Sequence, residues 1–284
     1  MPAKKIDIVT LHKMKGEGKP ITMVTAYDTP TARLLDAAGV DTVLVGDSVG
    51  NVVLGYPDTL PVTMEQMLHH TRAVRRGLER ALLIGDMPFM SYQADRAEAV
   101  RNAGRFLKEA GADAIKLEGG GPMVERVEAI VQAGIPVVGH LGLTPQSATL
   151  LGGYRVQGTD AASARRILDD ALALQAAGAF LLVLECVPAR LGELLSSRLD
   201  IPVIGIGAGS GCDGQVLVFH DLVGIEAGFK PKFVKRYTQA GAAMKLAVEQ
   251  YCQEVRARAF PAPEHTFSIP EEEFQQLVKA LPRE

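Results

Sequence analysis

The chain has 284 residues, of which 47% are hydrophobic and only 5% aromatic, so it can bury a large core built mainly from aliphatic side chains. Its 30 basic and 33 acidic residues leave a formal net charge of −3, which argues against the basic surface of a nucleic-acid-binding protein. The three cysteines, Cys186, Cys212 and Cys252, follow no metal-binding spacing and are typical of reduced thiols in a cytoplasmic protein. Residues 1–20 lack the apolar segment of a signal peptide, and no apolar run is long enough to span a bilayer. We therefore expect a cytoplasmic protein without a membrane or nucleic-acid partner.

Short apolar segments alternate with amphipathic ones along most of the chain. A short helix is predicted over 10–15, with Thr10 as its N-cap. Eight apolar segments follow, each bounded by turn residues, and most are separated by helical patterns. The predicted strands begin near residues 21, 42, 82, 114, 136, 180, 202 and 215. Continuous apolar runs of this kind are typical of parallel strands that are covered on both faces.

Eight strands alternating with helices predict an α/β fold, a (β/α)₈ TIM barrel over about 21–237. An open doubly wound sheet is the alternative, but it usually has fewer strands and a glycine-rich turn directly after the first one, and that turn is absent here. Helical patterns over 239–260 and 271–281 form a C-terminal extension over about 239–284. We predict one barrel domain spanning 1–284. Its N-terminal helix either plugs the bottom of the barrel or packs on a neighbouring subunit, and its C-terminal helices are expected to pack against other subunits.

Three acidic residues, Asp47, Asp86 and Glu118, each end a different predicted strand. The carboxyl ends of parallel strands meet at one rim of an α/β barrel, so these side chains should converge. Any one of them alone is also a common cap for the loop or helix that follows. Three neighbouring carboxylates would repel one another without a cation, and an all-oxygen set favours Mg²⁺ over zinc. The sequence therefore predicts a magnesium site at this rim.

Two basic side chains accompany these acids. Lys116 lies two residues before Glu118, so strand alternation directs both side chains into the barrel mouth. Lys116 either forms a buried ion pair with a strand-end acid or supplies a cation for a substrate carboxylate. His140 follows the strand that starts near residue 136, and it either belongs to the functional rim with the acids or is only a satisfied hydrogen-bonding group.

A fourth carboxylate, Glu185, ends the strand that starts near residue 180 and is expected across the barrel from the other acids. Its place between Leu184 and Cys186 predicts partial desolvation, which suits a general base. A salt bridge to Arg190 or Lys116 is the alternative.

Two glycine-rich segments, 119–121 and 205–211, follow predicted strands. Backbone amides in such segments can bind a phosphate at a barrel rim, but glycines also simply permit tight turns there. The chain contains no Walker or dinucleotide-binding fingerprint, so we favour the turn interpretation.

Long segments of the chain, up to about Tyr237, closely resemble the ketopantoate hydroxymethyltransferase family. The resemblance lies in Asp41–Tyr56, Asp86–Gln93, Ile115–Gly119, Gly139–Gln146, Gly153–Gln157, Leu184–Pro188, Ile204–Gly209 and Cys212–Leu217. It implies transfer of a one-carbon unit from 5,10-methylenetetrahydrofolate to 3-methyl-2-oxobutanoate, giving 2-dehydropantoate and tetrahydrofolate in pantothenate biosynthesis. It also implies a Mg²⁺-dependent barrel assembled as a homodecamer.

The same resemblance implies a role for each candidate residue, carried over position by position. The metal ligands are Asp47, Asp86 and Glu118. The α-keto acid is bound by Asp47, Ser48, Asp86, Lys116 and His140. Glu185 is the catalytic base that removes a proton from the β-carbon, and the resulting enolate is stabilised by Mg²⁺, which is chelated by the keto and carboxylate oxygens.

Two other functions remain open from the residues alone. One is a Mg²⁺-dependent keto-acid lyase or mutase of the phosphoenolpyruvate mutase type, whose lyases keep a catalytic cysteine in a loop. No cysteine lies between Asp86 and His140 in this chain. The other is a non-catalytic barrel scaffold, which would tolerate the loss of Asp47 and Asp86.

Overall fold

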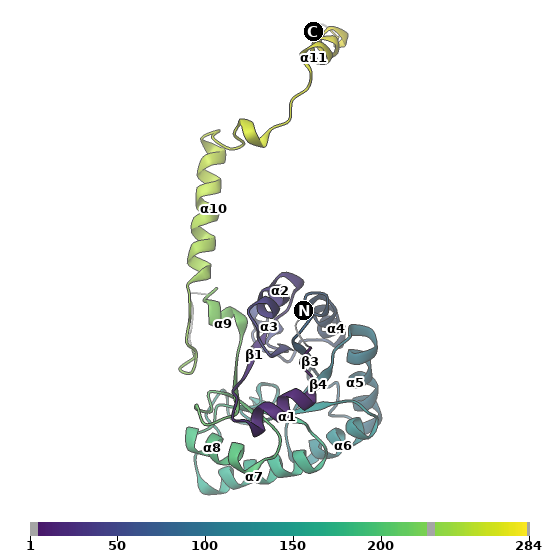
Figure 1. Cartoon of the computed structure of the whole chain (residues 1–284), viewed down its shortest axis with the longest axis vertical. Coiled ribbons are helices and arrows are strands. Elements are labelled where there is room, and N and C mark those ends of the chain that lie inside the picture. The colour runs from purple at the N-terminus through teal and green to yellow at the C-terminus, as the bar shows by residue number, and fades with distance from the viewer. Residues whose placement is uncertain (1–4, 226–230, 283–284) are drawn as a thin grey trace. The chain divides into compact units, whose positions relative to one another are not determined.

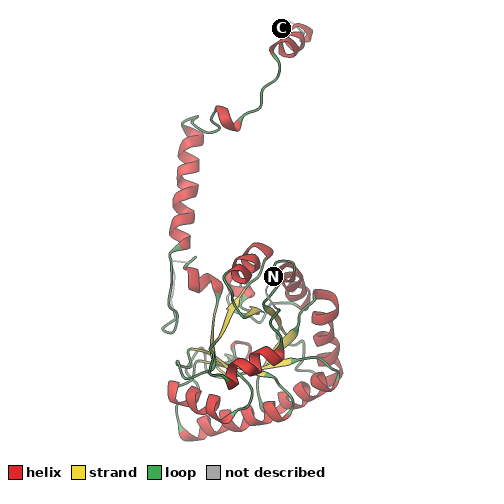
Figure 2. Cartoon of the chain, viewed as in Figure 1, coloured by secondary structure: helices red, strands yellow, loops and turns green. Residues whose placement is uncertain are grey.

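The computed structural model describes residues 5–225 and 231–282. Eight parallel strands form a closed barrel in which neighbours along the chain are neighbours in space and β8 pairs with β1. Figure 2 shows the strands inside a ring of helices. The strands are β1 (Ile21–Thr25), β2 (Thr42–Val45), β3 (Leu82–Asp86), β4 (Ala114–Glu118), β5 (Val137–Gly142), β6 (Leu181–Glu185), β7 (Val203–Ile206) and β8 (Gly214–Leu217). The predicted TIM barrel is confirmed, and an open doubly wound sheet is excluded.

The helices of the barrel begin where short polar side chains cap them. Asp28, Thr63, Asp95 and Asp160 each accept a hydrogen bond from a backbone amide in the first turn of a helix. Gly111 ends α5 in the left-handed conformation that glycine adopts without strain. These helices are α2 (Thr29–Ala37), α3 (Val49–Val52), α4 (Met64–Arg75), α5 (Arg96–Ala110), α6 (Val124–Gln132), α7 (Ala161–Ala176), α8 (Ala189–Arg198) and α9 (Phe219–Val223).

Two hydrophobic layers surround the strands. Side chains such as Val43, Leu83 and Leu182 point outward and pack against the helices. Alternate residues of the strands, such as Leu44, Ile84 and Val138, fill the barrel interior as a separate cluster. This alternation decides which strand residues can reach the mouth of the barrel.

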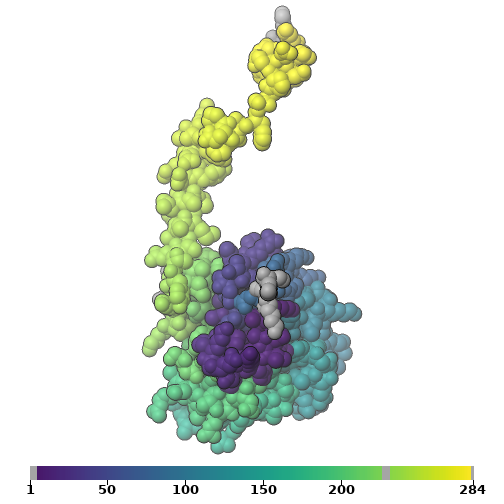
Figure 3. All heavy atoms as spheres, viewed as in Figure 1, coloured from purple at the N-terminus to yellow at the C-terminus, as the bar shows by residue number. Residues whose placement is uncertain are grey.

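The N-terminal helix α1 (Ile8–Gly16) closes one end of the barrel. Leu11 and Met14 are buried in the same cluster as the interior strand residues. The Lys15 ammonium lies 2.6 Å from Asp213 Oδ2 and 2.8 Å from the carbonyl of Ser196. Figures 1 and 3 show α1 across the middle of the ring on this face. Of the two predicted placements, the plug is therefore correct, although the helix starts earlier than expected and is capped by Asp7.

The described residues fall into two compact units, 5–222 with 231–236, and 223–225 with 237–282. The second unit contains α10 (Ala240–Arg256), a 3₁₀ turn at Pro263–His265 and α11 (Glu271–Ala280). The predicted C-terminal helices are thus present, whereas the assignment of 1–284 to one domain stays a prediction. Within the described part of the chain, no helix has the length and apolar character needed to cross a membrane.

Candidate active site

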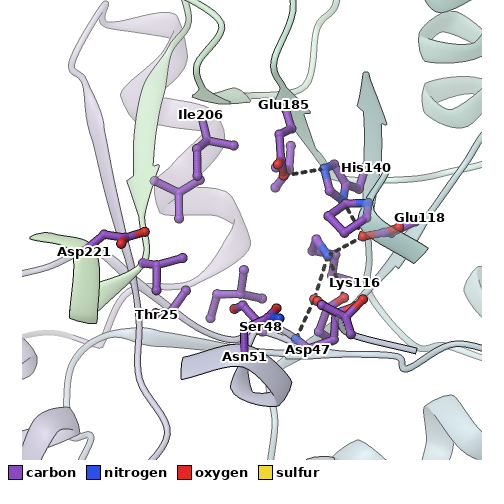
Figure 4. Close-up of a pocket in the computed structure, with 18 of the residues that line it drawn as sticks. Thr25, Asp47, Ser48, Asn51, Lys116, Glu118, His140, Glu185, Ile206 and Asp221 are labelled. Atoms are coloured by element: carbon purple, nitrogen blue, oxygen red, sulfur yellow. Dashed lines mark hydrogen bonds and ion pairs between the residues drawn. The ribbon is translucent and has the colours of Figure 1, made fainter. Parts of the chain in front are cut away.

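A pocket opens at the carboxyl ends of the strands, and it contains all of the side chains singled out from the sequence. One side is polar, and it is formed by Asp47, Ser48, Asp86, Lys116, Glu118, His140 and Glu185. The other side is largely apolar, with Leu44, Val183, Ile206, Val216, Val218 and Phe233. Figure 4 shows the charged side chains pointing toward one another around the pocket.

Strand register explains why the charged groups are adjacent. Asp86 lies beside Lys116 across the β3–β4 pair, and Glu118 lies beside His140 across the β4–β5 pair. Glu185 lies beside Gly142 across the β5–β6 pair. All of these charged side chains occupy inward-facing positions of their strands. Ile84, Val138 and Val183, which precede Asp86, His140 and Glu185 by two residues, belong to the cluster inside the barrel.

Two sequence-based expectations were wrong in detail, namely the end of the strand before His140 and the partner of Glu185. His140 lies within β5 and does not follow it, because the strand continues through Leu141 and Gly142. Glu185 lies across the barrel from Asp47, because β6 is four strands from β2 in the closed ring, but only β5 separates its strand from that of Glu118. Its partner is His140, and neither of the expected partners, Arg190 and Lys116, takes that place.

Lys116 and Asp86 form a buried ion pair. The Lys116 Nζ atom lies 2.7 Å from both carboxylate oxygens of Asp86 and 3.9 Å from Glu118 Oε1. Burial disfavours the charged ammonium, but the carboxylates of Asp86, Glu118 and Asp47 outweigh it and raise the pKa of Lys116. Lys116 is therefore a permanent cation at the base of the pocket.

Asp47 lies just beyond β2, in the turn that leads into α3. Its backbone amide donates to Asp86 Oδ2 at 3.1 Å, which brings the two carboxylates together. Burial and, after it, the charges of Asp86 and Glu118 raise the pKa of Asp47 to about 8. The neighbouring charges disfavour the anionic form of Asp47, and a bound cation would stabilise that form.

His140 lies between two carboxylates. Its Nδ1 atom is 3.2 Å from Glu118 Oε1 and its Nε2 atom is 3.3 Å from Glu185 Oε2, although neither pair has the angles of a hydrogen bond. Burial and Lys116 disfavour the imidazolium, but the contacts with Glu118 and Glu185 prevail and raise the pKa of His140 to about 9. Burial alone would raise the pKa of Glu118, but the contact with His140 and the charge of His140 outweigh it and lower that pKa. The histidine is thus a second cation of the site.

Several polar residues of the site were not singled out by sequence reasoning. The Tyr27 hydroxyl lies 2.8 Å from Ser48 Oγ at the entrance to α3. Gln146 and Tyr92 are buried and hydrogen bonded to the acids of the site. All of these residues follow a strand closely, and that position is the signal that could have drawn attention to them.

No set of three or more His, Cys, Asp and Glu side chains within residues 5–225 and 231–282 already has the spacing of a metal site. Lys116 occupies both oxygens of Asp86, and the amide of Gln146 donates to Asp47 Oδ2. The other oxygen of Asp47, Oδ1, makes no hydrogen bond to the described residues. The carboxylates are close together, but they are held by protein donors.

Buried carboxylates, a lysine and a histidine at the carboxyl end of a closed parallel barrel define a TIM-barrel enzyme. The chain belongs to the ketopantoate hydroxymethyltransferase family, whose model matches residues 5–263.

Similar proteins agree with this membership along nearly the whole chain. The 3-methyl-2-oxobutanoate hydroxymethyltransferase of Carboxydothermus hydrogenoformans is 54% identical over 273 residues, covering 96% of this chain and 99% of that protein. The protein of the same name from Moorella thermoacetica is 57% identical over 263 residues, covering 93% and 98%. The resemblance inferred from the sequence is confirmed.

Solved structures with the same fold are more distant in sequence. A phosphonopyruvate hydrolase has a TM-score of 0.62 at 14% identity, covering 96% of this chain and 95% of that one. A 2,3-dimethylmalate lyase of the phosphoenolpyruvate mutase and isocitrate lyase superfamily has a TM-score of 0.60 at 16% identity, covering 96% and 94%. At these identities the likeness establishes the barrel fold alone.

Proposed function

We propose that this chain carries out the hydroxymethyl transfer of its family at the pocket described above, with Mg²⁺ held by the acids of that pocket. The activity is that of a 3-methyl-2-oxobutanoate hydroxymethyltransferase, which forms ketopantoate in pantothenate biosynthesis. The one-carbon donor is 5,10-methylenetetrahydrofolate, and tetrahydrofolate is the second product. The lyase and scaffold alternatives are set aside because relatives more than half identical carry this name. The observation that carries the proposed site is the convergence of three buried carboxylates on one pocket.

The donor chemistry of the site fits Mg²⁺. This ion is usually bound by one or two carboxylates and completes its shell with water and substrate oxygens. Asp47 offers Oδ1, and Asp86 lies within hydrogen-bond reach of the Asp47 backbone. Glu118 Oε2 accepts a hydrogen bond from the backbone N–H of Gln146, and its Oε1 atom lies beside His140. We therefore assign direct contact with the ion to Asp47 and Asp86, and contact through water to Glu118.

Substrate recognition is assigned to the polar residues around these acids. A bound Mg²⁺ would polarise the keto group and offset the negative charge that develops on its oxygen. Asp86 would help to hold the ion, and the Lys116 ammonium beside it would bind the substrate carboxylate. Ser48, held by Tyr27, adds a hydroxyl donor on the Asp47 side, and His140 lines the opposite side. The apolar residues Ile206 and Val216 face the space left for the branched alkyl group.

Glu185 is assigned the role of general base. Its side chain is 17% exposed, so it reaches the open part of the pocket, unlike Glu118 and Asp86. His140 Nε2 lies 3.3 Å from Glu185 Oε2, on the side of the carboxylate that faces Glu118. Glu185 removes the proton from the β-carbon of the keto acid, and that carbon then attacks the methylene group carried by the folate.

One assay tests the proposed function. The purified chain is incubated with 3-methyl-2-oxobutanoate and 5,10-methylenetetrahydrofolate, and tetrahydrofolate formation is followed with Mg²⁺ and after its removal by EDTA. We expect product with the ion, loss of the rate after chelation, and recovery when Mg²⁺ is restored. An undiminished rate after chelation would remove the metal from the proposal, and no product in either condition would refute the activity.

We also propose a homo-oligomer, with a decamer as the expected form, in the cytoplasm. The second compact unit supports the assembly, because its helices expose large apolar side chains. Leu246 and Val248 of α10 and Leu277 of α11 are each more than half exposed. Light scattering on the purified chain gives the number of subunits, and a monomer would refute the assembly.

A further inference from the structure

Gln146 is a buried residue of the site with no assigned role. It lies in the short 3₁₀ turn Pro145–Ser147 that follows β5, and it is 5% exposed. We propose that Gln146 is a positioning residue for the metal site, which orients the Asp47 carboxylate so that Oδ1 faces the ion. This inference rests on the Mg²⁺ site proposed above.

The amide nitrogen of Gln146 makes the contact with the acid. Nε2 donates to Asp47 Oδ2 at 2.9 Å and to the Met87 carbonyl at 3.0 Å, so both of its protons are used. One carboxylate oxygen of Asp47 is thereby fixed, and rotation of the carboxylate would break that bond.

The amide oxygen of Gln146 is fixed as well. Oε1 accepts from the Tyr92 hydroxyl at 2.8 Å and from Gln93 Nε2 at 3.3 Å. If the amide were turned over, its oxygen would face the Met87 carbonyl and the Asp47 carboxylate, which are acceptors and cannot donate. Only one orientation of the amide satisfies all four contacts.

The backbone of Gln146 contacts a second acid of the site. Its N–H donates to Glu118 Oε2 at 3.0 Å, while the Glu118 N–H donates to the Tyr92 hydroxyl at 3.1 Å. Gln146, which lies in the turn after β5, therefore connects the carboxylate of Asp47, after β2, with the carboxylate of Glu118, at the end of β4.

The two acids assigned to the ion are held in different ways. Asp86 is paired with the Lys116 ammonium, which neutralises its charge. Asp47 is held by an amide, which carries no net charge and therefore does not neutralise the carboxylate that a cation would bind. A neutral donor thus orients Asp47 without competing electrostatically with Mg²⁺. Groups of this kind around metal ligands change metal affinity about 10- to 100-fold when they are removed.

The test replaces the amide with an apolar side chain of similar length. In Gln146→Met the backbone contact with Glu118 remains and the four amide contacts are lost. Calorimetric titration with Mg²⁺, in the presence of 3-methyl-2-oxobutanoate, is expected to give a Kd about 10- to 100-fold weaker than that of the parent chain. The KM for Mg²⁺ rises by the same factor. A merely structural role would lower the melting temperature and kcat but leave the Mg²⁺ affinity of the folded protein unchanged.

Gln175→Met is the matched control. Gln175 also uses both ends of its amide, accepting from the Asp200 backbone at 2.7 Å and donating to Asp200 Oδ2 at 3.2 Å, but it lies on α7 outside the pocket. Its loss is expected to leave Mg²⁺ affinity unchanged. If Gln146→Met does not fold, Gln146→Asn keeps the amide but withdraws it from Asp47 by one methylene, and the same weakening is expected.

The outcomes separate the two proposals. A parent chain that binds no Mg²⁺ in this titration refutes the metal site itself. A parent chain that binds Mg²⁺, together with a folded Gln146 variant whose Kd lies within twofold of the parent's, overturns only the role of Gln146. An equal loss of affinity in the Gln175 control also overturns it.

Discussion

The Lys116 ammonium lies 2.7 Å from each carboxylate oxygen of Asp86, and both side chains are almost completely buried. Strand register places these two residues side by side on β4 and β3. The lysine thus supplies, from within the chain, a positive charge that balances part of the acidic cluster.

Removing this lysine should destabilise the metal-free protein. In Lys116→Met the Asp86 carboxylate is left buried without its partner, and breaking a buried pair in this way costs about 3–5 kcal/mol. Urea unfolding in EDTA measures the loss. Lys15→Met is the comparison, because the Lys15–Asp213 pair is more exposed, with side chains 14% and 17% accessible. We expect a smaller loss there, of about 1 kcal/mol after solvent screening; equal losses would contradict the argument.

Asp86→Asn should weaken Mg²⁺ and 3-methyl-2-oxobutanoate binding together. The substitution keeps the size of the side chain but removes a charge assigned to the ion, and the substrate is expected to bind partly through that ion. Calorimetry is expected to show at least a tenfold weaker Kd for Mg²⁺. Asp213→Asn removes the carboxylate of a lysine–aspartate pair at the end of the barrel covered by α1, and it should leave both affinities unchanged. Unaltered binding in Asp86→Asn would exclude Asp86 as a ligand.

Glu185→Gln should separate binding from proton removal. The amide keeps the shape of the side chain but cannot accept the β-carbon proton, and loss of a general base typically costs 10²- to 10⁴-fold. NMR measures the exchange of that proton with deuterium from the solvent in the presence of Mg²⁺. Keto-acid affinity is expected to stay near that of the parent chain. Glu193→Gln, an exposed change on α8, is the control, and exchange at the parent rate in Glu185→Gln would assign the base elsewhere.

Replacing Gly85 of β3 and Gly104 of α5 by alanine should change the stability of the fold in opposite directions. A Cβ atom on Gly85 would lie 2.4 Å from Cδ1 of the fully buried Phe106, so Gly85→Ala should destabilise the fold by about 1–3 kcal/mol. Gly104 lies within α5, and the nearest atom that a Cβ there would meet is Cδ1 of Ile135, at 3.9 Å. Gly104→Ala should therefore stabilise the helix by about 0.5–1 kcal/mol. Thermal and urea unfolding measure both changes, and a neutral Gly85→Ala would show that α5 can move away from β3.

The barrel was predictable because its strands are short apolar runs with clear ends. The strands that begin at Ile21, Thr42, Leu82 and Ala114 were predicted at their observed starts, and the other strands were predicted to start within one residue of theirs. Helix α3 was missed because Gly50 and Asn51 within Val49–Val52 are poor helix formers and suggested a loop. The extension of β5 past His140 was missed because Gly142 suggested an earlier end to the strand.

The acids and their convergence were predictable from strand ends, but their partners were not. The closer approach of Lys116 to Asp86, at 2.7 Å, than to Glu118, at 3.9 Å, depends on the register between β3 and β4, which no local pattern encodes. The contact of His140 with Glu185 depends likewise on the neighbouring pair β5 and β6. Gln146 acquires its contacts from residues far away in the chain, and a single glutamine after a proline carries no local sign of them.

The closure of the barrel has a consequence for biosynthesis. β1 pairs with β2 and also with β8, so the first strand to leave the ribosome must wait for the last one before its second edge is covered. During translation that edge is exposed, and an unpaired strand edge is a site at which nascent chains associate wrongly. The ring, and with it the rim on which the pocket opens, is completed only when Gly214–Leu217 has emerged from the exit tunnel.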